Sequence, residues 1–203
     1  LATRLGMSRN VLRDALASLE EQGLVTRQRG RGTIASPAVA NTTCRVDTEP
    51  TLSLMLQRAG FSATVKTLSV SIDPTCTPNS DGILLNLVSK RLFYADNIPV
   101  IYVEDYFENR AALDANSLIK LLQDLDHKEF LENIYTIVYA YTMVHVRAVL
   151  AQPWLAELFN IEPSSPVLQM EDYGYDVEHR LILHSMGYYR GDILDLKFLR
   201  KNL

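Results

Sequence analysis

The first 36 residues constrain this chain most, because they place helix and turn signals in a fixed order. Gly6 is a C-terminal stop for one short helical segment, and Ser8 is a favourable N-cap for the next helix. Apolar residues then recur at helical spacing up to Gly23, namely Leu12, Ala15, Leu16 and Leu19. Two β-rich stretches, 24–29 and 33–35, flank a tight turn at 30–32. This order predicts helix, turn, helix and hairpin within one small domain, residues 1–36.

The charge is divided unevenly between this domain and the remainder. Residues 1–36 hold six arginines against three carboxylates, a balance of +3, whereas the whole chain has a net charge of −4. The remainder is therefore at −7. A basic head on an acidic body indicates that only the head meets a polyanion.

Composition excludes several classes of protein. With 47% hydrophobic and 22% charged residues, the chain is typical of folded proteins. No run approaches the roughly 18 apolar residues that a membrane span needs, and the N-terminus does not resemble a signal peptide. Cys44 and Cys76 are too few for a disulfide framework or a four-ligand zinc site. We therefore expect a cytoplasmic protein without a metal or other cofactor.

The remainder of the chain is predicted to be a linker followed by a domain that contains both helices and strands. Residues 37–48 lack periodicity and are expected to be a linker, and residues 49–203 form the second domain. Helices are expected near 52–59, after Asp114 and from Pro153; strands are expected at 64–72, 84–94, 99–107, 138–146, 166–175 and 181–189. Because strands outnumber helices and adjoin through short turns, the fold class is α+β with a mainly antiparallel sheet.

The start of the second helix carries side chains suited to DNA. Ser8, Arg9, Asn10 and Arg13 lie where a helix-turn-helix meets the major groove. Arginine can bond guanine and asparagine can bond adenine, and both can hold phosphates. Arg29, Gly30 and Arg31 at the hairpin tip would form a wing. The alternative is a solvated basic helix and a surface hairpin of an unrelated protein.

The head resembles the winged helix of GntR-type bacterial transcription regulators. The resemblance rests on the segment 5–9, on Leu12-Arg13, and on Gly23-Leu24-Val25 before the Gly-x-Gly turn. It implies that Ser8, Arg9, Arg13 and Gly30 contact operator DNA. Val11 stands where the family usually has threonine, and the family's first helix is absent, so we expect an incomplete, N-terminally truncated DNA-binding domain.

The body resembles the UTRA domain of the HutC branch of these regulators, whose fold is similar to chorismate lyase. The motifs are Arg91 followed by Asp96, Pro99-Val100 and Glu104, then 151–158, 166–168, 175–176 and 188–192. The resemblance implies that two such domains form a homodimer and that each binds a small metabolite in a cleft of its sheet.

Candidate effector-binding residues follow from these strands. Arg91 is the natural ligand for an anion, and its alternative role is a salt bridge with Glu104 on the neighbouring strand. Further candidates are Tyr106, Tyr173, His184 and Ser185, although tyrosines and a lone histidine are more often structural. Phe93 and Leu183 stand where sugar-phosphate sensors carry polar ligands. We therefore expect a carboxylate or another weakly polar effector, or else a degenerate pocket.

Together these features predict a ligand-responsive bacterial transcription regulator. We expect a repressor that binds double-stranded operator DNA as a homodimer, with an affinity changed by a small metabolite. One alternative is a chorismate-lyase-like enzyme, with Arg91 binding the substrate and Glu104 or His184 as the acid, although no nucleophile–base pair is evident. Another is an interaction module that has kept the sensor fold without a ligand.

Overall fold

The computed structural model describes residues 1–47, 51–79, 82–109, 115–124 and 127–200. It divides into two compact units. The first consists of Leu1–Glu49 and Leu196–Leu203, and the second is Pro50–Asp195. Each unit is described by itself.

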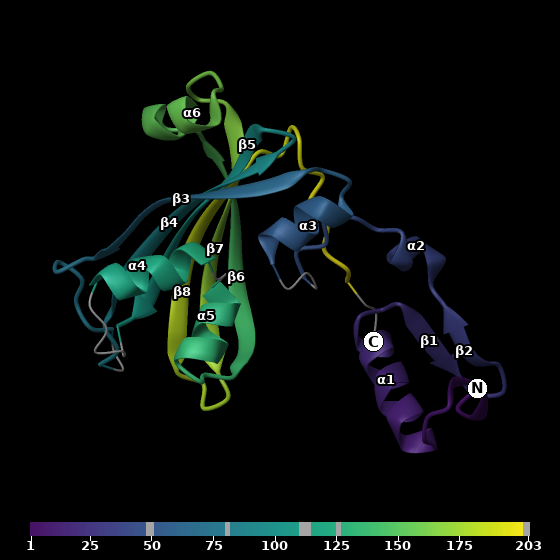
Figure 1. Cartoon of the computed structure of the whole chain (residues 1–203). Coiled ribbons are helices and arrows are strands. Elements are labelled where there is room, and N and C mark those ends of the chain that lie inside the picture. Colours follow the sequence, from purple (N-terminus) through teal and green to yellow (C-terminus); the bar gives the residue numbers. More distant parts are fainter. Residues whose placement is uncertain (48–50, 80–81, 110–114, 125–126, 201–203) are drawn as a thin grey trace. The chain divides into compact units, whose positions relative to one another are not determined.

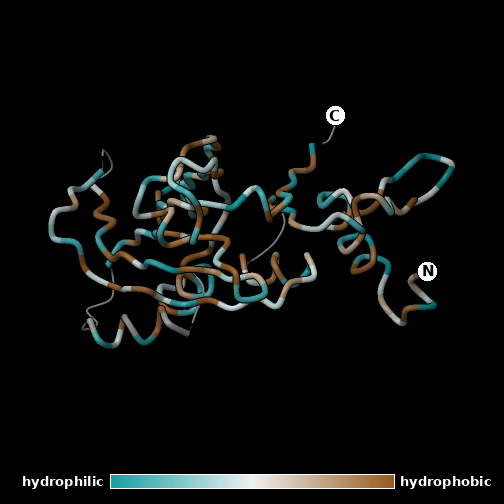
Figure 2. Tube along the Cα trace, turned by 90° about the horizontal axis from the view of Figure 1, so that it is seen from above, coloured by the Kyte–Doolittle hydropathy of each residue, from teal (hydrophilic) through white to brown (hydrophobic). Residues whose placement is uncertain are grey.

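The first unit contains the predicted helices and hairpin. A 3-10 helix, η1 (Thr3–Leu5), precedes α1 (Arg9–Glu21), and β1 (Val25–Gln28) pairs antiparallel with β2 (Gly32–Ala35). The turn glycines supply backbone angles that other residues adopt only with strain: φ is 65° at Gly6 and 82° at Gly30. The tip of the hairpin is hydrophilic, as Figure 2 shows for this part of the chain.

The segment predicted as a linker is instead structured. It forms the short helix α2 (Pro37–Ala40), and Arg45 pairs in parallel with Lys197 of the C-terminal segment. Arg45 is buried and donates hydrogen bonds to the Gln22 carbonyl at 2.9 Å and to both carboxylate oxygens of Asp47. Residues 37–47 and 196–200 therefore pack within the first unit. Lack of periodicity cannot reveal this, because a single helical turn and a long-range bridge have no repeating pattern.

The second unit is built on one six-stranded antiparallel sheet (Figure 1). Its strands are β3 (Ala63–Ile72), β4 (Leu85–Ala95), β5 (Ile98–Glu108), β6 (Tyr139–Leu150), β7 (Pro166–Asp176) and β8 (Leu181–Tyr189). They lie in the order β3-β4-β5-β8-β7-β6. This confirms the predicted α+β class and antiparallel sheet. The β4–β5 turn uses Asp96 and Asn97 with φ of 50° and 67°, the left-handed pair typical of tight hairpins.

In the described part of the second unit, four helices accompany the sheet: α3 (Leu52–Arg58), α4 (Ala115–Asp124), α5 (His127–Ile134) and α6 (Pro153–Phe159). Helix α5 was not predicted, and the expected cap Asp114 lies outside the described residues. Figure 1 shows α4 and α5 over one face of the sheet, where Leu118 and Phe130 join a core with Leu87, Phe107 and Leu183. We call this the helical face.

The opposite face of the sheet carries alternate residues of the same strands. Leu92 and Tyr102 on this face pack with Leu155 and Phe159 of α6. Lys90 on β4, Glu104 on β5 and His184 on β8 also lie on this side by strand alternation. We call it the cavity face, because it bears the cavity described below.

Candidate DNA-binding surface and effector cavity

The start of α1 presents its polar side chains to solvent. Ser8 caps the helix, since its Oγ accepts a hydrogen bond from the Val11 amide at 3.2 Å. Arg9, Asn10 and Arg13 are exposed, with 69% of the Arg13 side chain accessible. The first amides of a helix attract anions, so this end combines an N-terminal dipole with basic side chains.

The wing is tied to α1 by Arg27. Its Nη2 donates to the Arg13 carbonyl at 3.0 Å, and its backbone amide donates to Glu20 Oε1 at 3.0 Å. These bonds hold the hairpin against the helix within this unit. At the hairpin tip Arg29, Gly30 and Arg31 are exposed. The first unit therefore places its candidate DNA contacts on accessible surface.

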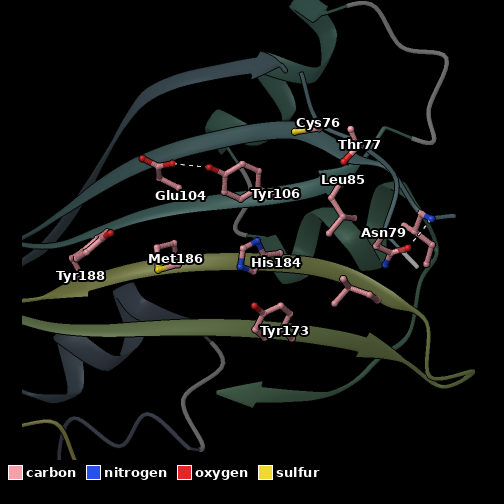
Figure 3. Close-up of a pocket in the computed structure, with 12 residues that line it drawn as sticks. Cys76, Thr77, Asn79, Leu85, Glu104, Tyr106, Tyr173, His184, Met186 and Tyr188 are labelled. Atoms are coloured by element: carbon pink, nitrogen blue, oxygen red, sulfur yellow. Dashed lines mark hydrogen bonds between the residues drawn. The ribbon is translucent and has the colours of Figure 1, made fainter. Parts of the chain in front are cut away.

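The second unit contains a cavity of about 550 Å³ on the cavity face of the sheet. One wall is the chain after β3, and the floor comes from strands β5, β7 and β8 (Figure 3). Twelve residues line it: Cys76, Thr77, Asn79, Ile83, Leu85, Glu104, Tyr106, Tyr173, Leu181, His184, Met186 and Tyr188. A volume of this size is ordinary for a small-molecule site.

Four of the six predicted effector residues line this cavity, and two do not. Glu104, Tyr106, Tyr173 and His184 meet there from three different strands. Arg91 and Ser185 are buried on the helical face. Placing them in the same site as the other four was wrong, because neighbouring residues of a strand point to opposite faces.

Glu104 carries the charge of the cavity floor. Its carboxylate accepts hydrogen bonds from Tyr102 at 2.6 Å, Tyr106 at 2.9 Å and Lys90 at 3.1 Å. Burial opposes ionisation of Glu104, but these three donors outweigh it and lower its pKa. The predicted Arg91–Glu104 salt bridge is wrong, because the register sets Lys90 opposite Glu104 and Arg91 opposite Val103.

Three rings stand side by side across the floor. His184 stacks on Tyr106 with ring centroids 5.6 Å apart and on Tyr173 at 4.9 Å. Beside them Glu171 accepts from Arg147 and Tyr173, each at 2.7 Å, and lies 3.2 Å from His184 Nε2. The bonds from Arg147 and Tyr173 lower the pKa of Glu171 to about 2, so it is ionised at neutral pH.

A polar row on the helical face was missed by the sequence reasoning. Ser89, Asp105, Ser185 and Asp172 are successive register partners across β4, β5, β8 and β7. Asp105 is fully buried and accepts 2.6 Å hydrogen bonds from Arg91 and from Ser185. Burial opposes its ionisation, but the Arg91 charge and the hydrogen bonds from Ser185 and Arg91 act together against burial, and the pKa of Asp105 is lowered.

Asp172 at the end of this row behaves differently. Burial, with the Asp105 charge nearby, raises the pKa of Asp172 to about 7. Its Oδ1, together with Ser89 Oγ and Arg91 Nε, is buried without a hydrogen-bond partner among the described residues. The sequence did contain a signal for this row. Asp105 and Asp172 alternate with the outward-facing residues of their strands, so their carboxylates are expected to face the core, where each needs a partner.

Comparison with known families decides the identity of the chain. The model of the UTRA domain matches residues 86–195, and the model of bacterial regulatory proteins of the gntR family matches residues 1–34. The chain belongs to the GntR family and carries a UTRA domain. The comparison with curated proteins found no match.

Solved structures share the fold of this GntR-family regulator at low sequence identity. YydK from Bacillus subtilis is 13% identical with a TM-score of 0.72, covering 99% of this chain and 86% of that one. PhnF from Mycobacterium smegmatis is 18% identical with a TM-score of 0.60, covering 98% and 88%. The SA0254 product of Staphylococcus aureus is 14% identical with a TM-score of 0.62, covering 79% and 100%. At such identities the likeness concerns the fold alone.

Two further structural facts bear on the chemistry of the regulator. Among its described residues, no group of three or more histidine, cysteine, aspartate or glutamate side chains is arranged to hold a metal ion. In the same parts of the chain, no helix is long and apolar enough to cross a membrane. The described lining of the cavity in the UTRA domain consists of hydrogen-bonding groups, aromatic rings, apolar side chains and one carboxylate.

Proposed function

We propose that this GntR-family regulator is a ligand-responsive repressor of the HutC branch that acts in the cytoplasm as a homodimer. Its contacts with double-stranded operator DNA come from Ser8, Arg9, Asn10 and Arg13 on α1, and from Arg29, Gly30 and Arg31 in the wing. The accessibility of these side chains supports this assignment. A dimer matches a pseudo-palindromic operator, since each head then reads one half-site.

The effector occupies the cavity lined by Glu104, Tyr106, Tyr173 and His184. The convergence of these four residues on one concavity is the observation that carries the proposal. Regulation requires only that the effector prefers one arrangement of the two heads. If that arrangement does not match the two half-sites, effector binding lowers the affinity for the operator. Operator binding then lowers the affinity for the effector by the same factor.

A chorismate-lyase-like enzyme is the weaker proposal. It needs Arg91 to bind a substrate carboxylate while Glu104 or His184 donates a proton to the same molecule. These groups lie on opposite faces of the sheet, and Arg91 is already paired with Asp105. One substrate cannot contact both sides of a β-sheet.

The DNA-binding part is tested by fluorescence anisotropy with the full-length protein and the DNA upstream of its own operon. Binding should weaken steeply with salt, because each neutralised phosphate contributes about −0.9 to the slope of log K against log salt. Arg9→Ala and Arg13→Ala should each weaken binding, and a residue that holds a phosphate should also flatten this slope. Arg58→Ala, an exposed arginine of α3 in the other unit, is the control. Absent or salt-insensitive binding would refute the proposal.

The effector part is tested by thermal unfolding of the full chain with the substrates and products of enzymes encoded beside its gene. A true effector at 100 times its dissociation constant adds about 2.7 kcal/mol of stability. Met186→Trp, which fills the cavity, should abolish that gain. If no metabolite stabilises the chain, the interaction-module alternative is favoured instead.

A further inference from the structure

The floor of the cavity presents hydrogen-bond acceptors. The hydroxyl of Tyr106 donates to Glu104 Oε2 at 2.9 Å, and that of Tyr173 donates to Glu171 Oε1 at 2.7 Å. A phenol has one proton to donate, so both oxygens are left with acceptor capacity only. Two of the three rings of the floor therefore already donate their hydroxyl protons to carboxylates.

The third ring, His184, also faces a carboxylate. Its Nε2 lies 3.2 Å from Glu171 Oε1. Because Glu171 is ionised, the His184 nitrogen that faces it is the donor of this contact. The donors of Tyr106, Tyr173 and His184 Nε2 are therefore directed at carboxylates. Tyr188 differs, because its hydroxyl accepts from Gln169 at 3.1 Å and keeps one proton to donate.

The charge of the cavity is negative. Among the described lining residues, Glu104 is the one carboxylate, and none is a lysine or an arginine. The cation nearest to it, Lys90, donates to Oε1 of Glu104 and is 39% exposed, so water screens it. The Glu104 side chain is only 19% exposed, which strengthens its interaction with a ligand charge.

The remaining walls are largely apolar. Ile83, Leu85, Leu181 and Met186 surround the acceptors. A ligand that fits must bring an apolar body together with donors aimed at Glu104. An anion would instead lie beside the Glu104 carboxylate, with no lysine or arginine among the described lining residues to balance its charge.

We propose that the cavity selects an organic cation, an amine or amidinium group on an apolar body, with Glu104 as the residue that recognises the charge. The inference rests on the effector site proposed above and assigns its ligand class. It departs from the carboxylate effector expected from the sequence, because that expectation depended on Arg91, which lies on the other face of the sheet.

A matched pair of probes tests the sign of the charge: benzamidine and benzoate have nearly the same shape and opposite charges. Isothermal titration of the full chain should show benzamidine binding at least about tenfold more tightly than benzoate. This is the lower end of the difference expected for a hydrogen bond to a charged group. The same titrations of the variant Met186→Trp, whose larger side chain fills the cavity, should show weaker binding of both probes.

Variants at two positions should move the preference in opposite directions. Glu104→Gln should bring the benzamidine-to-benzoate ratio to within about threefold, whereas Lys90→Met should tighten benzamidine binding severalfold by removing the competing cation. Glu157→Gln, an exposed carboxylate of α6, is the control and should leave the ratio unchanged. The Lys90 variant tests the inference even if Glu104→Gln is unstable.

The inference is overturned if benzoate binds as tightly as benzamidine, if neither probe binds, or if both variants leave the ratio unchanged. These outcomes are separable from failure of the proposed function. Operator binding and its salt dependence are measured without a probe. If the cation preference alone is absent, the proposed ligand class is wrong and the proposed regulator function stands. Absence of operator binding removes the regulator, whatever the probes show.

Discussion

Arg91 donates from Nη2 to Oδ2 of Asp105 at 2.6 Å, and both side chains are buried on the helical face of the UTRA sheet. Ser185 completes the arrangement with a second 2.6 Å hydrogen bond to Asp105. An arginine that the sequence suggested as an effector ligand is thus a structural partner of a carboxylate. Loss of Arg91 should therefore lower the free energy of unfolding.

Arg91→Met should destabilise the chain by about 3–5 kcal/mol, because it leaves the Asp105 charge buried without its partner. The double variant Arg91→Met with Asp105→Leu should lose much less, since no buried charge remains. Urea unfolding of the wild type, both single variants and the double variant gives the coupling energy. Additive losses would show that the pair is not coupled.

Asp172→Asn should change how stability depends on pH. The pKa of Asp172 is about 7 in the folded chain, above its ordinary value of about 3.9. The unfolded chain therefore loses this proton first as pH rises, and the folded state is penalised progressively between about pH 4 and pH 7. Relative to wild type, Asp172→Asn should gain roughly 2 kcal/mol between pH 5 and pH 7.

The measurement is the free energy of unfolding of both proteins at half-unit steps of pH. Asp14→Asn serves as a control, because the Asp14 side chain is 77% exposed. Parallel curves for Asp172→Asn and wild type would contradict the assignment. Glu171 acts in another window: its pKa is lowered, so its contribution is present above its ordinary pKa and is lost only as pH falls toward 2.

Ser8→Ala should loosen the start of α1, the helix proposed to contact DNA. The substitution removes the acceptor of the Val11 amide, and loss of such a cap costs about 1 kcal/mol. Amide exchange at Val11 should accelerate about fivefold, and operator binding should weaken with it. Ser18→Ala, in the body of the same helix, is the matched control and should not accelerate exchange at Val11.

Gly187→Ala should destabilise the sheet by about 1–3 kcal/mol. A Cβ at Gly187 would lie 2.7 Å from Cε2 of Tyr189, whose ring is buried on the same strand. Gly191→Ala is the control, since no atom lies within 4 Å of a Cβ at that position. Equal thermal stability of the two variants would show that the Tyr189 ring can move aside.

Much of the secondary structure could be read from the chain itself. The strand predicted at 99–107 is β5, Ile98–Glu108, and Pro153 begins α6 as expected. Local chemistry sufficed there, because prolines, turn residues and apolar runs act within a few residues. Helix α5 escaped because eight residues carry only about two turns of pattern.

The sequence by itself determined the order of the two functional parts: Ser8, Arg9 and the Gly30 turn mark the DNA-reading head, and the later hairpins predict a sensing sheet. Only the tertiary structure decided which side chains share a site. It set Lys90 beside Glu104, turned Arg91 toward Asp105, and joined Tyr106, Tyr173 and His184 in one cavity. The reason is physical: side chains alternate between the two faces of a strand, and a one-residue change of register exchanges those faces. Local patterns locate strands, but only their pairing fixes that register.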